Sequence, residues 1–265
     1  MKNRALGDGM TLMTLIFSLF GIVAWVIAGV LLYFRRKTLA KTELMRGVQT
    51  SPASEVSATA PGTLVEVKGT LRCEEPLTSE MAEKSCAYYL SQVVRVYEVT
   101  DRDSDGDSRT SRRSEVVASN ERFAPFVVED ESGAVGVRGE GAEVDALEVM
   151  NRFERETGGA GTITLGGVTV NLGGGARTVG YRYEEKILPV DSSVYVLGAA
   201  QEDGQVGVPT EEGEGERFLM SYRSEEQLEK KYKRDALWQG LIAVGLFLFG
   251  LIFLAVGVGS AVNGA

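Results

Sequence analysis

Two long runs of uncharged residues constrain this chain more than any other feature. Residues 10–34 read MTLMTLIFSLFGIVAWVIAGVLLYF, and residues 237–262 read LWQGLIAVGLFLFGLIFLAVGVGSAV. At about 1.5 Å of rise per residue, either run can cross a hydrocarbon core of roughly 30 Å as a helix. A cleaved signal peptide fits the first run poorly, because that run is too long and ends in basic residues without a clear cleavage site. We therefore predict transmembrane helices at residues 10–34 and 237–262.

Basic residues gather at the inner end of each run, and this asymmetry orients the predicted helices. Only Lys2 and Arg4 precede the first run, and no basic residue follows the second. The positive-inside rule then places the middle of the chain in the cytoplasm and both short termini outside. The predicted basic collar, which we expect to contact anionic lipid headgroups, consists of Arg35, Arg36, Lys37, Lys41, Lys230, Lys231, Lys233 and Arg234.

Helical signals continue from each run toward the middle of the chain. Residues 35–46 can extend the first helix until Gly47, a residue type that favours helix ends. The stretch Ser224-Glu225-Glu226-Gln227 fits a capping box, and its two glutamates suit the positive end of a helix. We therefore predict helical stalks at residues 35–46 and 224–236.

The segment between the stalks, residues 47–223, carries mostly strand patterns. TLVEVKGTLR, CAYYLSQVVRVYEV and SVYVLGAA alternate in polarity, and FAPFVVEDESGAVGVRG is typical of a hairpin with its turn at residues 131–133. Gly69 and Gly198 would mark bulges or tight bends, as in small barrels. We predict a mainly β soluble domain, a small barrel or sandwich and α+β at most. Residues 78–85 and 141–155 show weak helical patterns, and residues 50–62 have the composition of a disordered start.

The chain contains no histidine, and this absence excludes several classes of site. It removes Ser-His-Asp and Cys-His catalysis and every His-ligated metal site. Two cysteines, Cys73 and Cys86, cannot supply four zinc ligands alone. In the cytoplasm they would be reduced, and one or both would be buried, although their spacing also allows them to approach one another.

No motif in the chain predicts an enzyme. The glycine-rich stretches lack the patterns of a P-loop or a dinucleotide fold, and turns or bulges account for them better. The pairs Glu74-Glu75 and Glu184-Glu185 are typical of solvated faces, because adjacent residues on a strand point to opposite sides. We expect no catalytic site, no cofactor and no small-molecule substrate.

Charge is spread unevenly along the chain. Between residues 47 and 222 there are 31 acidic and 16 basic residues, and only three of the bases are lysines. A domain of this kind repels nucleic acid, so no nucleic-acid partner is expected. The acidic, halophile-like composition is also typical of a protein that stays soluble at high salt.

The stretch DRDSDGDSRTSRR at residues 101–113 begins like an EF-hand calcium loop. The candidate ligands are Asp101, Asp103, Asp105 and Asp107. The twelfth position of such a loop requires a bidentate glutamate, and here it is Arg112. The flanking segments also have strand patterns rather than helical ones. We expect an exposed hairpin loop, with a calcium site as the weaker alternative.

Five segments, taken in order, resemble the GIDE family, also called the BAM ("beside a membrane") domain. They are PGTLVEVKGTLRCEEPLTS, CAYYLSQVVRVYE, PFVVEDESGAVGV, GYRYEEKILPVDSSVYVLGAAQ and RFLMSYRSEEQLEKKYKR. The order of apolar run, β-rich segment and apolar run is also similar. The resemblance implies membership of a family of membrane-bound E3 ubiquitin ligases.

The chain departs from the eukaryotic members of that family at its C-terminal end. Those members carry a RING after the second span, whereas this sequence stops three residues past it and holds too few Cys and His for a RING. The resemblance therefore implies a RING-less, prokaryotic-type member, and no ligase residue is carried over. In mitochondrial relatives the β-rich segment faces the intermembrane space, which conflicts with the cytoplasmic side that the charges predict here.

These observations favour a membrane-anchored, non-enzymatic module that binds a protein partner or self-associates. The first alternative is a component of an E3 ligase system that needs a RING from another chain. The second is an ion-responsive membrane sensor acting through the aspartates of residues 101–107.

Overall fold

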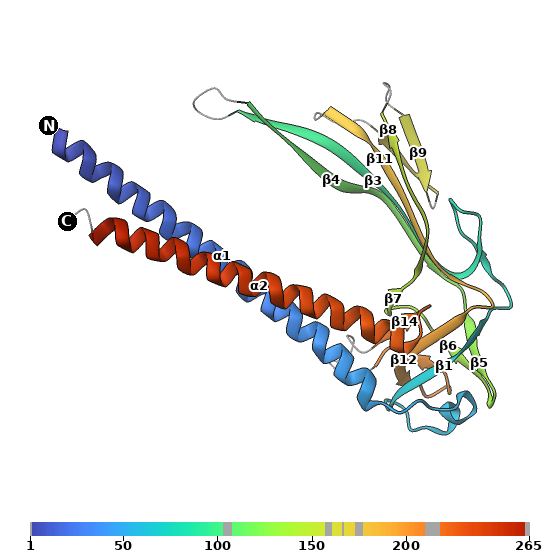
Figure 1. Cartoon of the computed structure of the whole chain (residues 1–265). Helices are drawn as coiled ribbons and strands as arrows, with labels where there is room; N and C mark the ends of the chain where they lie inside the picture. The colour runs from blue at the N-terminus through green and yellow to red at the C-terminus, as the bar shows by residue number, and fades with distance from the viewer. Residues whose placement is uncertain are drawn as a thin grey trace. The chain divides into compact units, whose positions relative to one another are not determined.

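A computed structural model of the chain describes residues 2–102, 108–156, 161–165, 167–172, 177–209 and 218–262. Its contacts divide it into two units, one formed by the terminal segments up to Gly47 and from Glu225 onward, the other by Val48–Ser224. The first unit is a pair of helices and the second is built mainly of strands (Figure 1). This confirms the predicted fold class, a mainly β domain flanked by two helices that are long and apolar enough to span a membrane.

The two helices are α1 (Lys2–Gly47) and α2 (Glu225–Val262), which run antiparallel (Figure 1). Both are longer than a hydrocarbon core of roughly 30 Å requires, because each continues without a break past its apolar run. Only 17% of the most apolar stretch of each helix is buried. A core helix of a soluble protein would be mostly buried, so the exposed Leu, Ile, Val and Phe side chains suit contact with lipid.

Small residues allow α1 and α2 to pack closely. Ala24 and Ala28 of α1 and Ala243 of α2 are buried. A Cβ atom on Gly250 would lie 2.6 Å from the Trp25 ring, so only a glycine leaves room for this indole. The Trp25 N–H donates to the backbone oxygen of Phe247 at 3.2 Å. Close approach through small residues is the usual way in which helices associate in lipid.

The strands of the first sheet close on themselves into a small barrel. They are β1 (Leu64–Arg72), β5 (Phe126–Asp130), β6 (Gly133–Val137), β7 (Glu143–Asp145), β12 (Ser193–Ala200), β13 (Val206–Gly207) and β14 (Leu219–Ser221). The pairings run in the ring β1-β5-β6-β13-β12 and return to β1, while β14 and β7 extend from β12. The predicted hairpin with its turn before Gly133 is confirmed as β5 and β6.

The barrel core is made of the inward-facing residues of these strands. Alternation places Val65, Val67 and Leu71 of β1 inside, together with Val194 and Val196 of β12. The 3-10 helix η1 (Ala53–Ala58) adds Ala53 and Val56, which are 2% and 0% exposed. The prediction of a disordered start at residues 50–62 is therefore wrong, because two apolar residues three positions apart bury enough surface to order this polar segment.

Gly69 and Gly198 have a different role from the predicted bulges. The β1–β12 register runs through both residues without a shift. A Cβ atom on Gly69 would lie 2.3 Å from the backbone oxygen of Glu129, and one on Gly198 would lie 2.8 Å from the Phe218 ring. Each glycine therefore lets a neighbouring group approach its strand, and at Gly69 this allows β5 to pair with β1 where the pairing with β12 ends.

The second sheet, which we call the arm, has long antiparallel strands that curve away from the barrel strands (Figure 1). It contains β2 (Leu77–Thr78), β3 (Ser85–Arg102), β4 (Ser108–Phe123), β8 (Leu147–Arg155) and β11 (Arg177–Pro189). Tyr88 of β3 and Leu188 of β11 belong to the barrel core. Farther along the same strands, Val93 and Tyr181 pack with Leu165 of the hairpin β9 (Gly161–Leu165) and β10 (Val168–Leu172).

Both predicted short helices are wrong. Residues 141–155 contain β7 and β8, which pair with β14 and β11, so sheet pairing overrides the helical propensity of their Glu, Leu and Met residues. Residues 78–85 form the end of β2, a turn and the start of β3. In that turn the backbone N–H groups of Met81 and Ala82 donate to a carboxylate of β11 instead of forming helical hydrogen bonds.

Candidate functional site

An open groove of about 1100 Å³ lies on the outside of the β5–β6 hairpin. Val127, Ala134 and Gly136 of its lining face outward, because alternation turns the side chains of Phe126, Val128, Val135 and Val137 toward the barrel core. In register across three strands, Arg72 of β1 lies beside Val127 of β5, which lies beside Gly136 of β6. Small residues at the floor of β6 keep the surface hollow.

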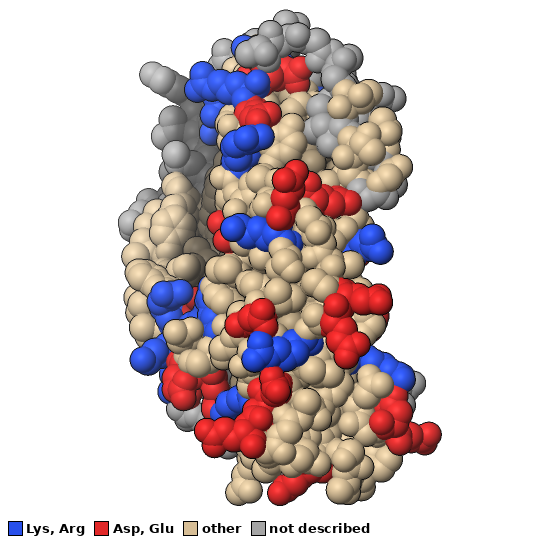
Figure 2. Space-filling view, turned by 90° about the vertical axis from the view of Figure 1, so that its right-hand side faces the viewer, with Lys and Arg blue, Asp and Glu red and all other residues tan. Residues whose placement is uncertain are grey.

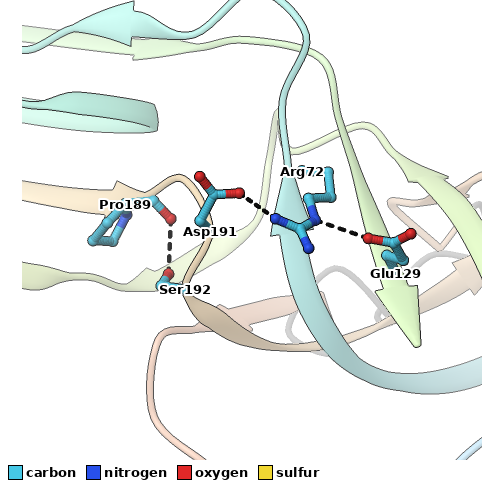
Figure 3. A network of polar contacts seen from close by, with 5 residues as sticks. All are labelled: Arg72, Glu129, Pro189, Asp191 and Ser192. Atoms are coloured by element: carbon cyan, nitrogen blue, oxygen red, sulfur yellow. Dashed lines mark hydrogen bonds and ion pairs between the residues drawn. The ribbon is translucent and has the colours of Figure 1, made fainter. Parts of the chain in front are cut away.

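A polar network forms the β1 side of this groove (Figure 3). The Arg72 guanidinium donates to Glu129 of β5 at 2.8 Å and to Asp191, which lies in the turn between β11 and β12. Hydrogen bonds to these two carboxylates raise the pKa of Arg72. All three side chains are at least half exposed, so the network shapes the surface and contributes little to stability.

The backbone holds Asp191 in place beside Arg72. Its N–H donates to the oxygen of Leu71 at 2.9 Å, and the N–H of Leu71 donates to Ser192 at 2.9 Å. The Ser192 hydroxyl donates to Pro189 at 2.7 Å, which closes the turn (Figure 3). Asp191 has a φ of 58°, a left-handed conformation that Asp tolerates better than most residues. This side of the groove is therefore preorganised.

The turn between β12 and β13 forms the opposite side. Asp203 of this turn pairs with Arg138, which follows β6. The Gln205 side chain lies against Gly136, where an added Cβ atom would be 3.0 Å from its Cγ. At the end of β5, Asp130 accepts a hydrogen bond from the N–H of Ala53 at 2.9 Å, which attaches η1 to the β5–β6 hairpin. Hydrogen bonds from Ser132, Ala53 and Gly133 lower the pKa of Asp130.

The charged residues of the groove are mostly acidic. The two basic residues of its lining are Arg72 and Arg138, and each is paired with a carboxylate that also lines the groove. The acidic residues that line the groove are Glu74, Glu75, Glu129, Glu140, Asp191 and Asp203. Figure 2 shows the face at the right-hand side of Figure 1, where acidic and basic side chains lie beside one another. The lining of the groove therefore carries a net negative charge beside a floor of small, apolar residues.

The two cysteines are both free and have different surroundings. Cys73 is partly exposed at the edge of the groove, and its thiol donates to the oxygen of Pro125 at 3.4 Å. Burial raises the pKa of Cys73, and this effect together with the charges of Glu75 and Glu74 outweighs a backbone hydrogen bond at Glu75 that lowers it. Cys86 is fully buried beside Tyr89 and Ile187 in the arm, where burial raises its pKa to about 11. Neither thiol is an activated nucleophile.

Two carboxylates of the β domain are buried, and one of them belongs to a pair for which the sequence predicted a solvated face. Glu66 of β1 is 1% exposed, accepts the hydroxyl of Tyr195 at 2.9 Å and pairs with Lys68 at 2.8 Å. Glu185 of β11 is 0% exposed and accepts hydrogen bonds from Ser79, Ser91, Met81 and Ala82. The interpretation of Glu184-Glu185 as a solvated pair is therefore wrong for Glu185. In both sites the hydrogen bonds replace those to water, as a buried charge requires.

The structure places part of the candidate calcium loop. Asp101 is exposed at the end of β3, opposite Arg109 of β4, whereas Asp103, Asp105 and Asp107 lie outside the described residues. The strands β3 and β4 on either side agree with the predicted hairpin. Among the residues that the structure describes, no group of three or more Cys, Asp and Glu side chains is arranged to hold a metal ion.

The predicted collar residues all lie on α1 or α2. Arg35 donates to the backbone oxygen of Ala236 at 3.2 Å, which links the two helices. Lys37 lies over the ring of Tyr33, and Lys233 pairs with Glu229 one helical turn away. The remaining members are Arg36, Lys41, Lys230, Lys231 and Arg234.

Nothing local in the sequence predicted the groove. Arg72, Glu129 and Asp191 come from three separate segments, and only strand pairing brings them together. The best available signal was the run of small residues, GAVG, in the second strand of the predicted hairpin. Small outward-facing residues on a strand are typical of a place where something approaches the backbone.

Comparisons with known proteins find one family. The family model GIDE, described as E3 Ubiquitin ligase, matches residues 96–257. The match includes β5, β6 and both turns that border the groove, while residues 72–75 precede it. No curated protein and no solved structure matches the chain.

Proposed function

Because the chain belongs to the GIDE family, we propose that it is a membrane-anchored interaction module whose barrel groove binds a segment of a protein partner. The observation that carries the proposal is the open groove of about 1100 Å³, with a small apolar floor and preorganised charged sides. A surface of this kind can bind without first ordering its own side chains, so less conformational entropy is lost on binding.

The helix pair supports an anchoring role. Its two apolar stretches would hold the β domain at the bilayer surface, and the continuous extensions at residues 35–46 and 225–236 would act as stalks. Anchoring restricts the orientation of the domain before a partner arrives. In this proposal the module acts by contact rather than by chemistry.

Site-specific photocross-linking of the full chain in its native membranes tests the groove. A photoreactive residue at Val127, which is 36% exposed in the groove, should give a discrete cross-linked product. The matched control is Val116 of β4, which is 54% exposed but lies on the arm. Since Val116 is the more exposed valine, random collisions would favour it. Equal cross-linking at both positions, or none at Val127, contradicts the proposal.

We place the β domain on the cytoplasmic side, with the basic collar at the headgroups. The support is the excess of basic residues at the inner end of each helix. Cys73 provides a natural reporter, because it is partly exposed whereas Cys86 is buried. A membrane-impermeant maleimide should label Cys73 only after cells are permeabilised, and Cys73→Ser should remove the signal. Labelling of intact cells would put the domain outside.

A second candidate function follows from the family description. The chain would then be a component of an E3 ubiquitin ligase system in which another chain supplies the RING, because these 265 residues contain no His and only two Cys. In a reconstituted ubiquitin-transfer assay the purified chain alone should give no transfer. Transfer should begin when a RING protein recovered at Val127 is added. Transfer by the chain alone would show that it acts without a RING.

A further inference from the structure

We infer that the occupant of the groove is an extended, basic polypeptide segment of the partner protein. This inference rests on the proposed function and adds the chemistry of the ligand. It is carried by the shape of the groove together with the excess of acidic over basic residues in its lining.

The charge of the groove selects for arginine and lysine. The lining contains six carboxylates and two guanidinium groups. Both guanidinium groups already have carboxylate partners. Within the described part of the chain, Glu74, Glu75 and Glu140 are exposed and form no ion pair. A basic segment would neutralise these carboxylates, whereas an acidic segment would add to their repulsion.

The carboxylates lie on both sides of the floor. Glu74 and Glu75 follow β1 on one side, and Glu140 and Asp203 lie on the β6 and β13 side. Between them the floor offers Val127, Ala134 and Gly136. An extended segment along the hairpin points successive side chains in different directions, so its basic side chains can reach the carboxylates while apolar ones rest on the floor.

The direct test is binding of a short fluorescent peptide that alternates arginine and valine. Fluorescence anisotropy is measured with the full chain in a nonionic detergent, and a peptide alternating glutamate and valine serves as the comparison. The basic peptide should bind, and more salt should weaken it because the sites are exposed. The double substitution Glu74→Gln/Glu75→Gln should weaken binding by about tenfold.

A matched variant separates groove binding from general attraction to an acidic protein. Glu83→Gln/Glu148→Gln removes the same charge from exposed positions on the arm side. It should change the affinity by less than about twofold. If both double variants weaken binding equally, the attraction is to the overall charge and the inference is wrong.

Protection of Cys73 gives a second measurement that needs no variant. The bound peptide should slow modification of Cys73 by maleimide, because this thiol lines the groove. Protection by the glutamate peptide, or by an uncharged one equally well, would overturn the basic occupant while leaving a docking groove in place. Protection that rises with protein concentration alone would instead identify a second copy of this chain as the occupant.

The two proposals can fail separately. If the cross-linked partner from native membranes attaches at Val127 through a segment without basic residues, the inference is wrong and the interaction module stands. If Val127 gives no cross-link although the basic peptide protects Cys73, the groove has the inferred chemistry but the proposed function is wrong.

Discussion

Replacing Glu185 by glutamine tests whether a buried carboxylate holds the turn after β2 onto the arm. One carboxylate oxygen accepts the Ser91 hydroxyl at 2.6 Å and the Met81 N–H at 2.9 Å. The other accepts the Ser79 hydroxyl at 2.8 Å and the Ala82 N–H at 2.7 Å. Both oxygens therefore face one hydroxyl, which can turn around, and one backbone N–H, which cannot.

The cost of Glu185→Gln follows from this arrangement. Whichever way the amide is placed, its NH₂ group meets one backbone N–H, so a buried donor loses its acceptor. The remaining hydrogen bonds become weaker, because glutamine lacks the negative charge of the Glu185 carboxylate. Together these losses should destabilise the turn by about 2–4 kcal/mol.

Reactivity of Cys86 measures this local opening in the full chain. Cys86 is fully buried and pairs with Leu77 of β2, next to the turn. In a Cys73→Ser background, Glu185→Gln should speed thiol labelling about 30-fold to 700-fold, at a factor of ten per 1.4 kcal/mol. Glu184→Gln is the control, because this neighbour points to the other face of the sheet. A Glu185→Gln rate within about threefold of the parent rate would refute the argument.

Acid should remove the difference between Glu185 and glutamine. Burial alone would raise the pKa of Glu185, but the hydrogen bonds from Ser91, Met81, Ala82 and Ser79 outweigh it and lower the pKa below 4.5. A lowered folded-state pKa contributes stability that is present above the unfolded value and lost as pH falls through the folded value. The gap in thermal midpoint between the two proteins, followed by circular dichroism, should therefore narrow below about pH 4.5. A gap that widens in acid would contradict the assignment.

Three further predictions follow from close contacts. Gly69→Ala should destabilise the barrel by about 2–4 kcal/mol, seen as a lower thermal midpoint, because its Cβ atom would lie 2.3 Å from a backbone oxygen; an unchanged midpoint would contradict this. Gly250→Leu should separate α1 from α2, because the new side chain displaces the Trp25 ring. A disulfide engineered between the two helices should then form more slowly. An unchanged rate of disulfide formation would show that the Trp25 ring does not need this space. Asp130→Ala should release the start of η1 at a cost of about 1 kcal/mol, measured by faster hydrogen exchange of Ala53, and unaltered protection would contradict this role of the Asp130 hydrogen bond.

Several features could be predicted from the sequence because their causes are local. An uncharged run of sufficient length is a membrane-helix signal wherever it occurs, and α1 and α2 contain both runs. Alternating polarity predicted β1, β3 and β12, and the turn before Gly133 predicted the β5–β6 hairpin. The family resemblance also depended on the order of such segments, and the family match confirms it.

Closure of the barrel and the composition of the groove were decided only by the tertiary structure. Arg72, Val127 and Asp191 become neighbours because β1 pairs with β5 and the turn before β12 folds back onto β1. Glu185 is buried because Ser79 and Ser91 meet it from two other segments, although its sequence neighbourhood is charged. Residues 147–155 form a strand because β11 offers them a partner. In each case the deciding free energy comes from contacts between residues far apart in the chain, which no local pattern contains.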